Sequence, residues 1–435
     1  MMDGTGPGPA GQSAAGQGND RLALLALISA FGFIFISRGV ADSWMVFLLP
    51  VEQDFGATRQ QTAGVYSVYM LTTGLSAPLA GLILRQFGAR LNYGLGVLLI
   101  GCAMFLAAQA SVMIELYLYV GILASMGISA IGIVPASALI GRWYRHRMSV
   151  AMGVAYSGLG TGSLLMVPLA QWLIEWQGWR STYTTMGCGL AILLVVTMLL
   201  PWQRLAGATP LRGRGADGGT DPAGSGITLR QAVGRPEFLG LALSFTFTGF
   251  SMYTVIVQVV PFLVESGYAP LKAATAFGLA GMLSVGGVIS TGWLSHRYGL
   301  RPIALLSFTC TFAGIFCLLF LSYHRLEWLL VCFVGIFGIA QGARGPIVAT
   351  LSNRLFTGPS AAAIYGVIYA CSNIGAGIGA WGSGYLHDIS SSYRPALLVA
   401  AAGIVMAALP FLLLQAFRAP VPIQPAVPSH PEKSP

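Results

Sequence analysis

Residues 81–90 read GLILRQFGAR, and residues 292–301 repeat the pattern as GWLSHRYGLR. Glycine stands at the first and eighth positions of both stretches, and arginine stands at the tenth. At the same offset of 211 residues, Pro50 pairs with Pro261. Agreement at one constant offset indicates an internal repeat, so the chain is predicted to contain two copies of one structural unit.

The composition places these repeats in a membrane. Of the 435 residues, 55% are hydrophobic and 9% are charged, and the mean hydropathy is +0.73. An ordinary soluble domain has about a quarter of its residues charged. Because one bilayer crossing needs about 20 apolar residues, the apolar runs use most of the chain. This excludes a soluble enzyme and leaves no room for a separate catalytic domain.

Apolar runs bounded by Gly, Pro and charged residues predict twelve membrane-spanning helices. Their predicted ranges are 22–50, 60–84, 91–110, 114–140, 148–173, 180–201, 238–264, 272–295, 302–322, 327–353, 360–386 and 394–417. Because each copy has an even number of crossings, both insert the same way up and are related by an axis along the membrane normal. The predicted fold is an all-α membrane protein made of two six-helix bundles with a pseudo-two-fold axis.

The rest of the chain forms two tails and a linker. The predicted parts are a disordered cytoplasmic tail at 1–20, an N-terminal bundle at 21–201, a cytoplasmic linker at 202–237, a C-terminal bundle at 238–417 and a disordered cytoplasmic tail at 418–435. Most Lys and Arg residues fall on the side of the tails, which predicts cytoplasmic termini in a multi-pass protein of the cell inner membrane. The net charge of +9 therefore reflects topology, and no nucleic-acid partner is expected.

The repeats and their charged turns resemble the major facilitator superfamily over about residues 20–418. Residues 43–56 (SWMVFLLPVEQDFG), 142–180 and 363–388 resemble its branch of monocarboxylate transporters and oxalate/formate exchangers. The resemblance implies a monomer that moves small organic anions, often with a proton, by alternating access. It also implies a cavity lined by helices 1, 4, 7 and 10. Arg85 replaces the acidic residue usual in the helix 2–3 turn, so the salt-bridge latch of the superfamily is not expected there.

Three charged residues fall near the middle of predicted helices: Arg38 and Asp42 on the first and Arg344 on the tenth. A charge near the bilayer centre costs at least ~2.5–3.5 kcal/mol, so it normally faces a bundle interior or a watery cavity. If the helices follow the resemblance, Arg38 and Arg344 face each other across the cavity and bind a carboxylate through their forked donors.

Asp42 is the predicted proton-coupling residue, because all five His lie in loops or the tail and no other carboxyl group is expected within the membrane. Its protonation would release an arginine, so that proton and anion travel together. Arg38 and Asp42 are four residues apart and can pair on one helix face. The sequence leaves open whether Asp42 pairs with Arg38 or with Arg344, and whether the Arg38–Asp42 pair is only structural.

Polar and aromatic side chains on membrane helices complete the predicted substrate site. They are Gln341, Tyr369, Asn373, Tyr66 and Ser251. The alternative for each is ordinary hydrogen bonding between helices. The predicted conformational or gating residues are those of the repeated turns and of two Gly-rich helices, where small residues let helices approach closely: Gly81, Gly88, Arg90, Gly158, Gly292, Arg301 and Gly377.

The sequence predicts a secondary active transporter of a small, monocarboxylate-like organic anion, coupled to protons as a symporter. Its expected partners are that anion, protons and the lipid bilayer. The alternative is a proton-driven exporter of drug-like or metabolite molecules, for which an acidic, aromatic-lined cavity would be expected. A membrane sensor that binds ligand without transport is a third class. No motif predicts an enzyme, a metal site or a cofactor.

Overall fold

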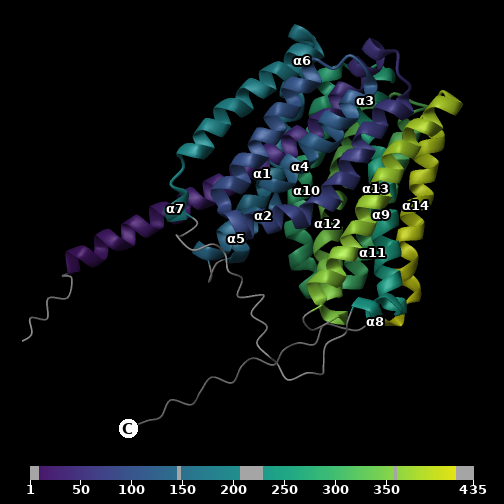
Figure 1. Cartoon of the computed structure of the whole chain (residues 1–435). Helices are drawn as coiled ribbons and strands as arrows, with labels where there is room; N and C mark the ends of the chain where they lie inside the picture. The colour runs from purple at the N-terminus through teal and green to yellow at the C-terminus, as the bar shows by residue number, and fades with distance from the viewer. Residues whose placement is uncertain (1–8, 145–147, 206–228, 357–359, 418–435) are drawn as a thin grey trace, which may run out of the picture.

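The computed structural model describes residues 9–144, 148–205, 229–356 and 360–417. Figure 1 shows the helices of the N-terminal half, in purple and blue, beside those of the C-terminal half, in green and yellow. The predicted tail at 418–435 lies outside the described residues. In Figure 1 the short helix α7 lies beside the lower left part of the N-terminal half, and α8 lies at the bottom of the C-terminal half.

The N-terminal half consists of α1 (Pro9–Phe55), α2 (Arg59–Ala108), α3 (Met113–Leu116), η1 (Tyr117–Ala124), α4 (Ser125–Ile131), α5 (Ile133–Trp143) and α6 (Met148–Leu199). Within the predicted linker lie α7 (Trp202–Leu205) and α8 (Leu229–Val233). The C-terminal half consists of α9 (Pro236–Glu265), α10 (Pro270–Tyr298), α11 (Leu300–Leu321), α12 (Glu327–Leu355), α13 (Ala361–Ser390), α14 (Arg394–Leu413) and η2 (Gln415–Phe417).

Ten of the described helices are long and apolar enough to cross a membrane. Two of them, α2 and α6, each turn back at a glycine with positive φ, namely Gly88 (φ 83°) and Gly178 (φ 78°). Each therefore supplies two crossings, which gives the predicted twelve. Gly299, the repeat partner of Gly88, has φ 89° and separates α10 from α11. Positive φ is easy only for glycine, so the repeated glycines mark the same turn in both halves.

The helix ends and one helix interior differ from the prediction. α1 begins at Pro9, inside the predicted disordered tail, and it continues past Pro50 to Phe55. The prediction ended this helix at Pro50 because proline usually kinks or breaks a helix, but here the residues beyond it stay helical. The fourth crossing is not one regular helix. It contains the π-helical turn η1 and ends its first part at Gly132, whose extended ψ of −154° breaks the hydrogen-bond ladder.

Two lines of contact join the halves. The α2–α13 seam is formed where Ser67 donates a hydrogen bond to the carbonyl of Gly377 (2.7 Å) and where Gly74 approaches Asn373. The α6–α10 seam is formed where Gly160 and Ser163 pack against the backbone of α10 around Gly281. Both seams use glycine because only a residue without Cβ lets the two backbones come this close.

Both seams open toward the end where the linker helices lie. Gly81 and Gly366 continue the contact faces of α2 and α13, yet a Cβ added at either would meet no atom within 4 Å. Gly153 on α6 and Gly292 on α10 are equally free of neighbours. Among the described residues, the halves therefore touch from mid-depth to the far end and separate toward the linker.

Candidate functional site

An ion pair lies at mid-depth, where the closed part of the seams ends. Arg38 Nε donates to Asp42 Oδ2 at 2.8 Å. The Arg38 side chain is 24% exposed, whereas Asp42 is 1% exposed. The structure thus resolves the pairing that the sequence left open, because residues four apart on one helix face meet without any movement of the backbone.

Ser163 on α6 ties this pair to the α6–α10 seam. Its hydroxyl donates to the same Asp42 Oδ2 that Arg38 contacts. The backbone carbonyl of Ser163 would lie 2.9 Å from a Cβ added to Gly278 of α10. The other carboxylate oxygen, Asp42 Oδ1, is buried and has no hydrogen-bond partner in the part of the chain that the structure describes. A single carboxyl group thus contacts both the cation of α1 and the helix that borders the other half.

Tyrosines from both halves surround Arg38. The rings of Tyr66 and Tyr69 on α2 lie 4.9 Å apart, and Tyr66 lies 5.8 Å from Tyr253 on α9. Arg38 is close enough to Tyr66 and Tyr253 for electrostatic interaction, and Tyr369 on α13 is within the same range of Arg38. We refer to the residues Arg38, Asp42, Ser163, Tyr66, Tyr69, Tyr253 and Tyr369 as the Arg38 site.

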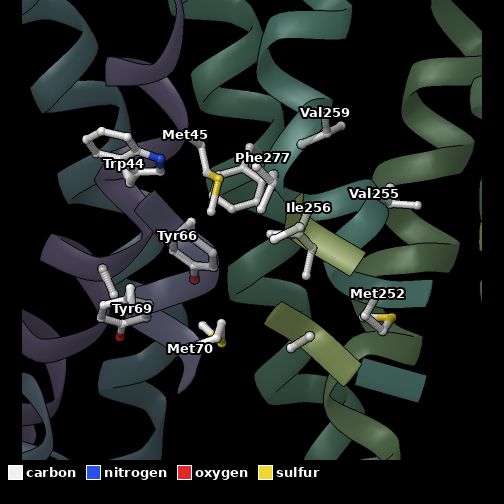
Figure 2. Close-up of a cluster of buried hydrophobic side chains, with 14 of the residues drawn as sticks. Trp44, Met45, Tyr66, Tyr69, Met70, Met252, Val255, Ile256, Val259 and Phe277 are labelled. Atoms are coloured by element: carbon white, nitrogen blue, oxygen red, sulfur yellow. The ribbon is translucent and has the colours of Figure 1, made fainter. Parts of the chain in front are cut away.

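An apolar layer closes the Arg38 site on the side away from the linker. It consists of Met45 on α1, Ile256 on α9 and Phe277 on α10, all buried. In Figure 2 these side chains face one another beside Tyr66, with residues of the two halves on opposite sides. A small cavity of about 20 Å³, lined by Trp44, Tyr66 and neighbouring residues, lies inside the N-terminal half. It has room for little more than a water molecule, so a substrate must approach from the open side.

A second cluster of charges joins the halves at the closed end. Arg59 is 2% exposed and contacts Glu52 of its own half and Glu265 of α9 (2.7 Å). Its backbone N–H donates to Asp388 of α13, and its guanidinium donates to the hydroxyl of Tyr393. Burial raises the pKa of Tyr393 well above its usual range, so this phenol stays neutral beside the cation.

We call Arg59, Glu52, Glu265, Asp388 and Tyr393 the Arg59 cluster. His387 adds a longer contact to Glu265, at 3.8 Å. The sequence carried no functional prediction for Arg59, because the predicted second helix begins at residue 60. Nothing in the pattern of one helix indicates that its first residue will meet acids from the other half, because the partners lie more than 200 positions away.

Arg344 does not face Arg38, contrary to the prediction. It lies on α12, 3% exposed, and points toward its own half. Its guanidinium donates to Thr311 Oγ1 and Met252 Sδ, both at 2.9 Å, and lies 5.5 Å from the ring of Phe308. No acidic side chain pairs with it among the described residues. The helical position was right, but the side chain points between α9 and α11 and not toward α1.

Two other predicted substrate residues also lie outside the Arg38 site. Ser251 is fully buried and donates to the carbonyl of Ala400 on α14, so it packs two helices of the C-terminal half together. Gln341 is half-buried on α12 and makes no hydrogen bond among the described residues. The other predicted substrate residues lie near Arg38. Tyr66 and Tyr369 border it, and Asn373 lies one turn from Tyr369. The Nδ2 of Asn373 donates to the carbonyl of Tyr369.

The predicted gating residues fall into three places. Gly377 lies on the α2–α13 seam, where an added Cβ would be 3.3 Å from the carbonyl of Ser67. Contrary to the prediction, Gly158 does not lie on a seam but packs within the N-terminal half against α1, 2.8 Å from the carbonyl of Phe31. Gly160, two residues later and therefore on another face of the helix, makes the contact with the other half.

The repeated turns hold the other predicted gating residues. Gly81 and Gly292 are equivalent positions on the open part of the seams, and Gly88 forms the turn within α2. After the turns, the two arginines of the repeat differ. Arg90 is exposed, whereas Arg301 Nε donates to the carbonyl of Phe411 at 2.8 Å and so caps the end of α14.

Comparison with known proteins gives concordant results. A sequence profile of the Major Facilitator Superfamily matches residues 22–324 and 288–434. The chain is 26% identical to Monocarboxylate transporter 13 of Bos taurus, with 87% of this chain and 86% of that protein covered. It is 25% identical to Monocarboxylate transporter 12 of Xenopus laevis, with 86% and 85% covered.

Two solved structures share the fold. One is a mutant of the nucleoside transporter NupG, with TM-score 0.72, 13% identity and coverage of 89% of this chain and 99% of that one. The other is a bacterial homologue of the human lysosomal transporter Spinster in an inward-facing, unoccupied conformation. It has TM-score 0.67 and 18% identity, and covers 91% of this chain and 97% of that one.

Proposed function

Because the chain belongs to the Major Facilitator Superfamily, we propose that it is a proton-coupled symporter of a small, monocarboxylate-like organic anion that works by alternating access. It is a transport protein related to the monocarboxylate transporters. The substrate, the coupled proton and the change of access are our proposals. The observation that carries them is the Arg38–Asp42 pair at mid-depth, bordered by side chains of both halves.

The pair can take up a proton and an anion together. While Asp42 is ionised, it occupies the Arg38 guanidinium and the site is neutral. Protonation of Asp42 weakens this pair and leaves the forked donors of Arg38 for a carboxylate, which arginine binds in a bidentate manner. The proton and the anion then enter together and add no net charge to the site. This lowers the cost of moving charge through the low-dielectric interior.

Ser163 couples this exchange to the seam. Its hydroxyl donates to Asp42 Oδ2, and its backbone packs on α10 of the other half. A change in the charge of Asp42 thus alters a contact at the α6–α10 seam. We propose that the loaded, neutral site lets both seams rock about their glycine contacts, so that the Arg59 cluster opens as the linker end closes.

We further propose that the open end faces the cytoplasm of a cell with this protein in its inner membrane, and that the monomer is the transporting unit. The support is the excess of Arg in the loops at the end where α7 and α8 lie, including the exposed Arg85 and Arg90. In this orientation the Arg59 cluster lies on the outer side.

The test is uptake of radiolabelled mono- and dicarboxylates into proteoliposomes under an imposed inward proton gradient. We expect accumulation of at least one monocarboxylate by the wild type and its loss in Arg38→Ala. Arg180→Ala is the matched control, because Arg180 pairs with Asp54 within the N-terminal half at the closed end. Uptake of no acid by the wild type would reject the proposal and favour the export of other metabolites. Uptake by Arg38→Ala equal to that of the wild type would show that the anion does not bind at this site.

A further inference from the structure

We infer that the transported anion is an aromatic monocarboxylate, with its carboxylate on Arg38 and its ring among the tyrosines of the seam. This inference rests on the proposed function and narrows it to one class of acid. Three features of the described residues support it. They are the net charge of the Arg38 site, a buried hydroxyl group without a hydrogen-bond partner there, and a row of tyrosine rings that leads from the open end to Arg38.

The charge count selects a monoanion. Arg38 and Asp42 cancel each other, and Arg344, the other cation near mid-depth among the described residues, points into its own half. Once Asp42 is protonated, the site holds a single positive charge. One carboxylate neutralises that charge, whereas a dicarboxylate would bring in a second charge with no partner. An unpaired charge at this depth is strongly unfavourable.

A free donor lies beside Arg38. Tyr66 is 2% exposed, and its hydroxyl has no hydrogen-bond partner among the described residues. It lies within electrostatic range of both Arg38 and Asp42. A buried polar group without a partner is costly, so the hydroxyl of Tyr66 is available to donate to an incoming carboxylate. This group and the guanidinium approach the anion from two different helices.

The row of phenols continues toward the open end. Tyr369 of α13 is 46% exposed, although it lies within range of Arg38 and Tyr253. Tyr365 lies one turn closer to the linker end, with its ring 6.4 Å from that of Tyr369. Tyr156 of α6 interacts with both from the other half. The rings therefore line the space between the halves on the path to Arg38.

Ordinary core packing does not explain this row. Its members come from α2, α6, α9 and α13, which belong to both halves and border the seams, and such surfaces must separate during alternating access. Aromatic rings contact one another favourably with centroids about 4.5–7 Å apart, edge to face or offset. In this arrangement the ring of an aromatic acid packs on the half-exposed Tyr369 while its carboxylate lies on Arg38. A short aliphatic acid would leave these faces without a partner.

The experiment measures uptake of phenylacetate, benzoate, lactate, phthalate and succinate by the full-length protein in proteoliposomes under the inward proton gradient. The inference predicts a KM for phenylacetate or benzoate at least tenfold below that for lactate, and no uptake of the dicarboxylates. Tyr369→Ala should raise the KM for the aromatic acid about tenfold and leave the KM for lactate within twofold. Tyr369→Phe, which keeps the ring, should restore the wild-type value.

Tyr385→Ala is the matched control, because Tyr385 is an exposed tyrosine of the same helix that stacks on Trp381 away from the Arg38 site. Equal shifts for Tyr385→Ala and Tyr369→Ala would overturn the role of Tyr369. If lactate or succinate is taken up in an Arg38-dependent manner and aromatic acids are neither transported nor inhibitory, the inference is wrong and the proposed anion site stands. If no carboxylate is taken up, both fall.

Discussion

Replacing Arg59 with glutamine should open the closed end of the protein. Among the described residues, Arg59 is the one that contacts acids of both halves there: its guanidinium meets Glu52 of α1 and Glu265 of α9, and its backbone meets Asp388 of α13. Glutamine keeps the polarity and removes the charge. The two carboxylates that share the guanidinium are then left facing each other without a cation.

The magnitude follows from burial. Truncation of one member of a buried, hydrogen-bonded charge pair costs about 2–5 kcal/mol. Arg59 is 2% exposed, but Glu265 is 40% exposed and partly solvated. We therefore expect the low end, about 2–3 kcal/mol. Because the pair with Glu265 joins the two halves and exists only while the closed end is shut, its loss shifts the equilibrium toward the open form by about 30- to 150-fold.

The assay is thiol labelling at Ile256, a residue of the apolar layer that is buried while this end is shut. Ile256→Cys is introduced into a protein whose six native cysteines are replaced, and a membrane-impermeant maleimide is added from the closed end. Labelling should accelerate about 30- to 150-fold in Arg59→Gln, by the same shift in equilibrium. Arg180→Gln is the control, since its partner Asp54 belongs to the same half. Equal labelling rates in the two variants would refute the reasoning.

Three further predictions concern the interior. Asp42→Asn should abolish proton-driven accumulation and retain exchange of anion for anion; full proton-driven uptake by this variant would place the coupling elsewhere. Arg344→Met should raise the Tm in detergent by about 2–4 °C for each kcal/mol gained, because it removes a buried charge that lacks an acid; loss of transport at an unchanged or higher Tm would return Arg344 to the transport cycle. Gly158→Leu should lower the Tm through its clash with α1, whereas Gly377→Leu should leave the Tm within a few degrees and abolish transport; the opposite assignment of effects would reject the seam described above.

The fold could be predicted from the sequence because its signals are local. Gly88 and Gly299 recur at one offset, and both have the positive φ that only glycine adopts easily. Apolar runs long enough to cross a bilayer predicted the helices that lie between these glycines. The break at Gly132 and the π-helical turn before it were missed, because hydropathy does not report how the backbone hydrogen bonds are arranged.

The site could be predicted only in part, because hydropathy gives the depth of a residue and not the direction of its side chain. A contact between Arg38 and Asp42 could be predicted as one of two pairings, because side chains four residues apart lie on one helix face. Arg344 was placed at the right depth and in the wrong direction. Ser163 and Arg59 were missed, because their roles arise from helices that meet across more than a hundred positions of sequence.

In the proposed cycle Arg38 and Asp42 carry one anion and one proton together. Uptake of a labelled monocarboxylate into proteoliposomes tests it directly when a potassium diffusion potential and a proton gradient are imposed separately. The account predicts electroneutral transport: the proton gradient drives accumulation, and a membrane potential of either sign leaves the initial rate unchanged. An initial rate that follows the potential in the absence of a proton gradient would show net charge movement and contradict the account.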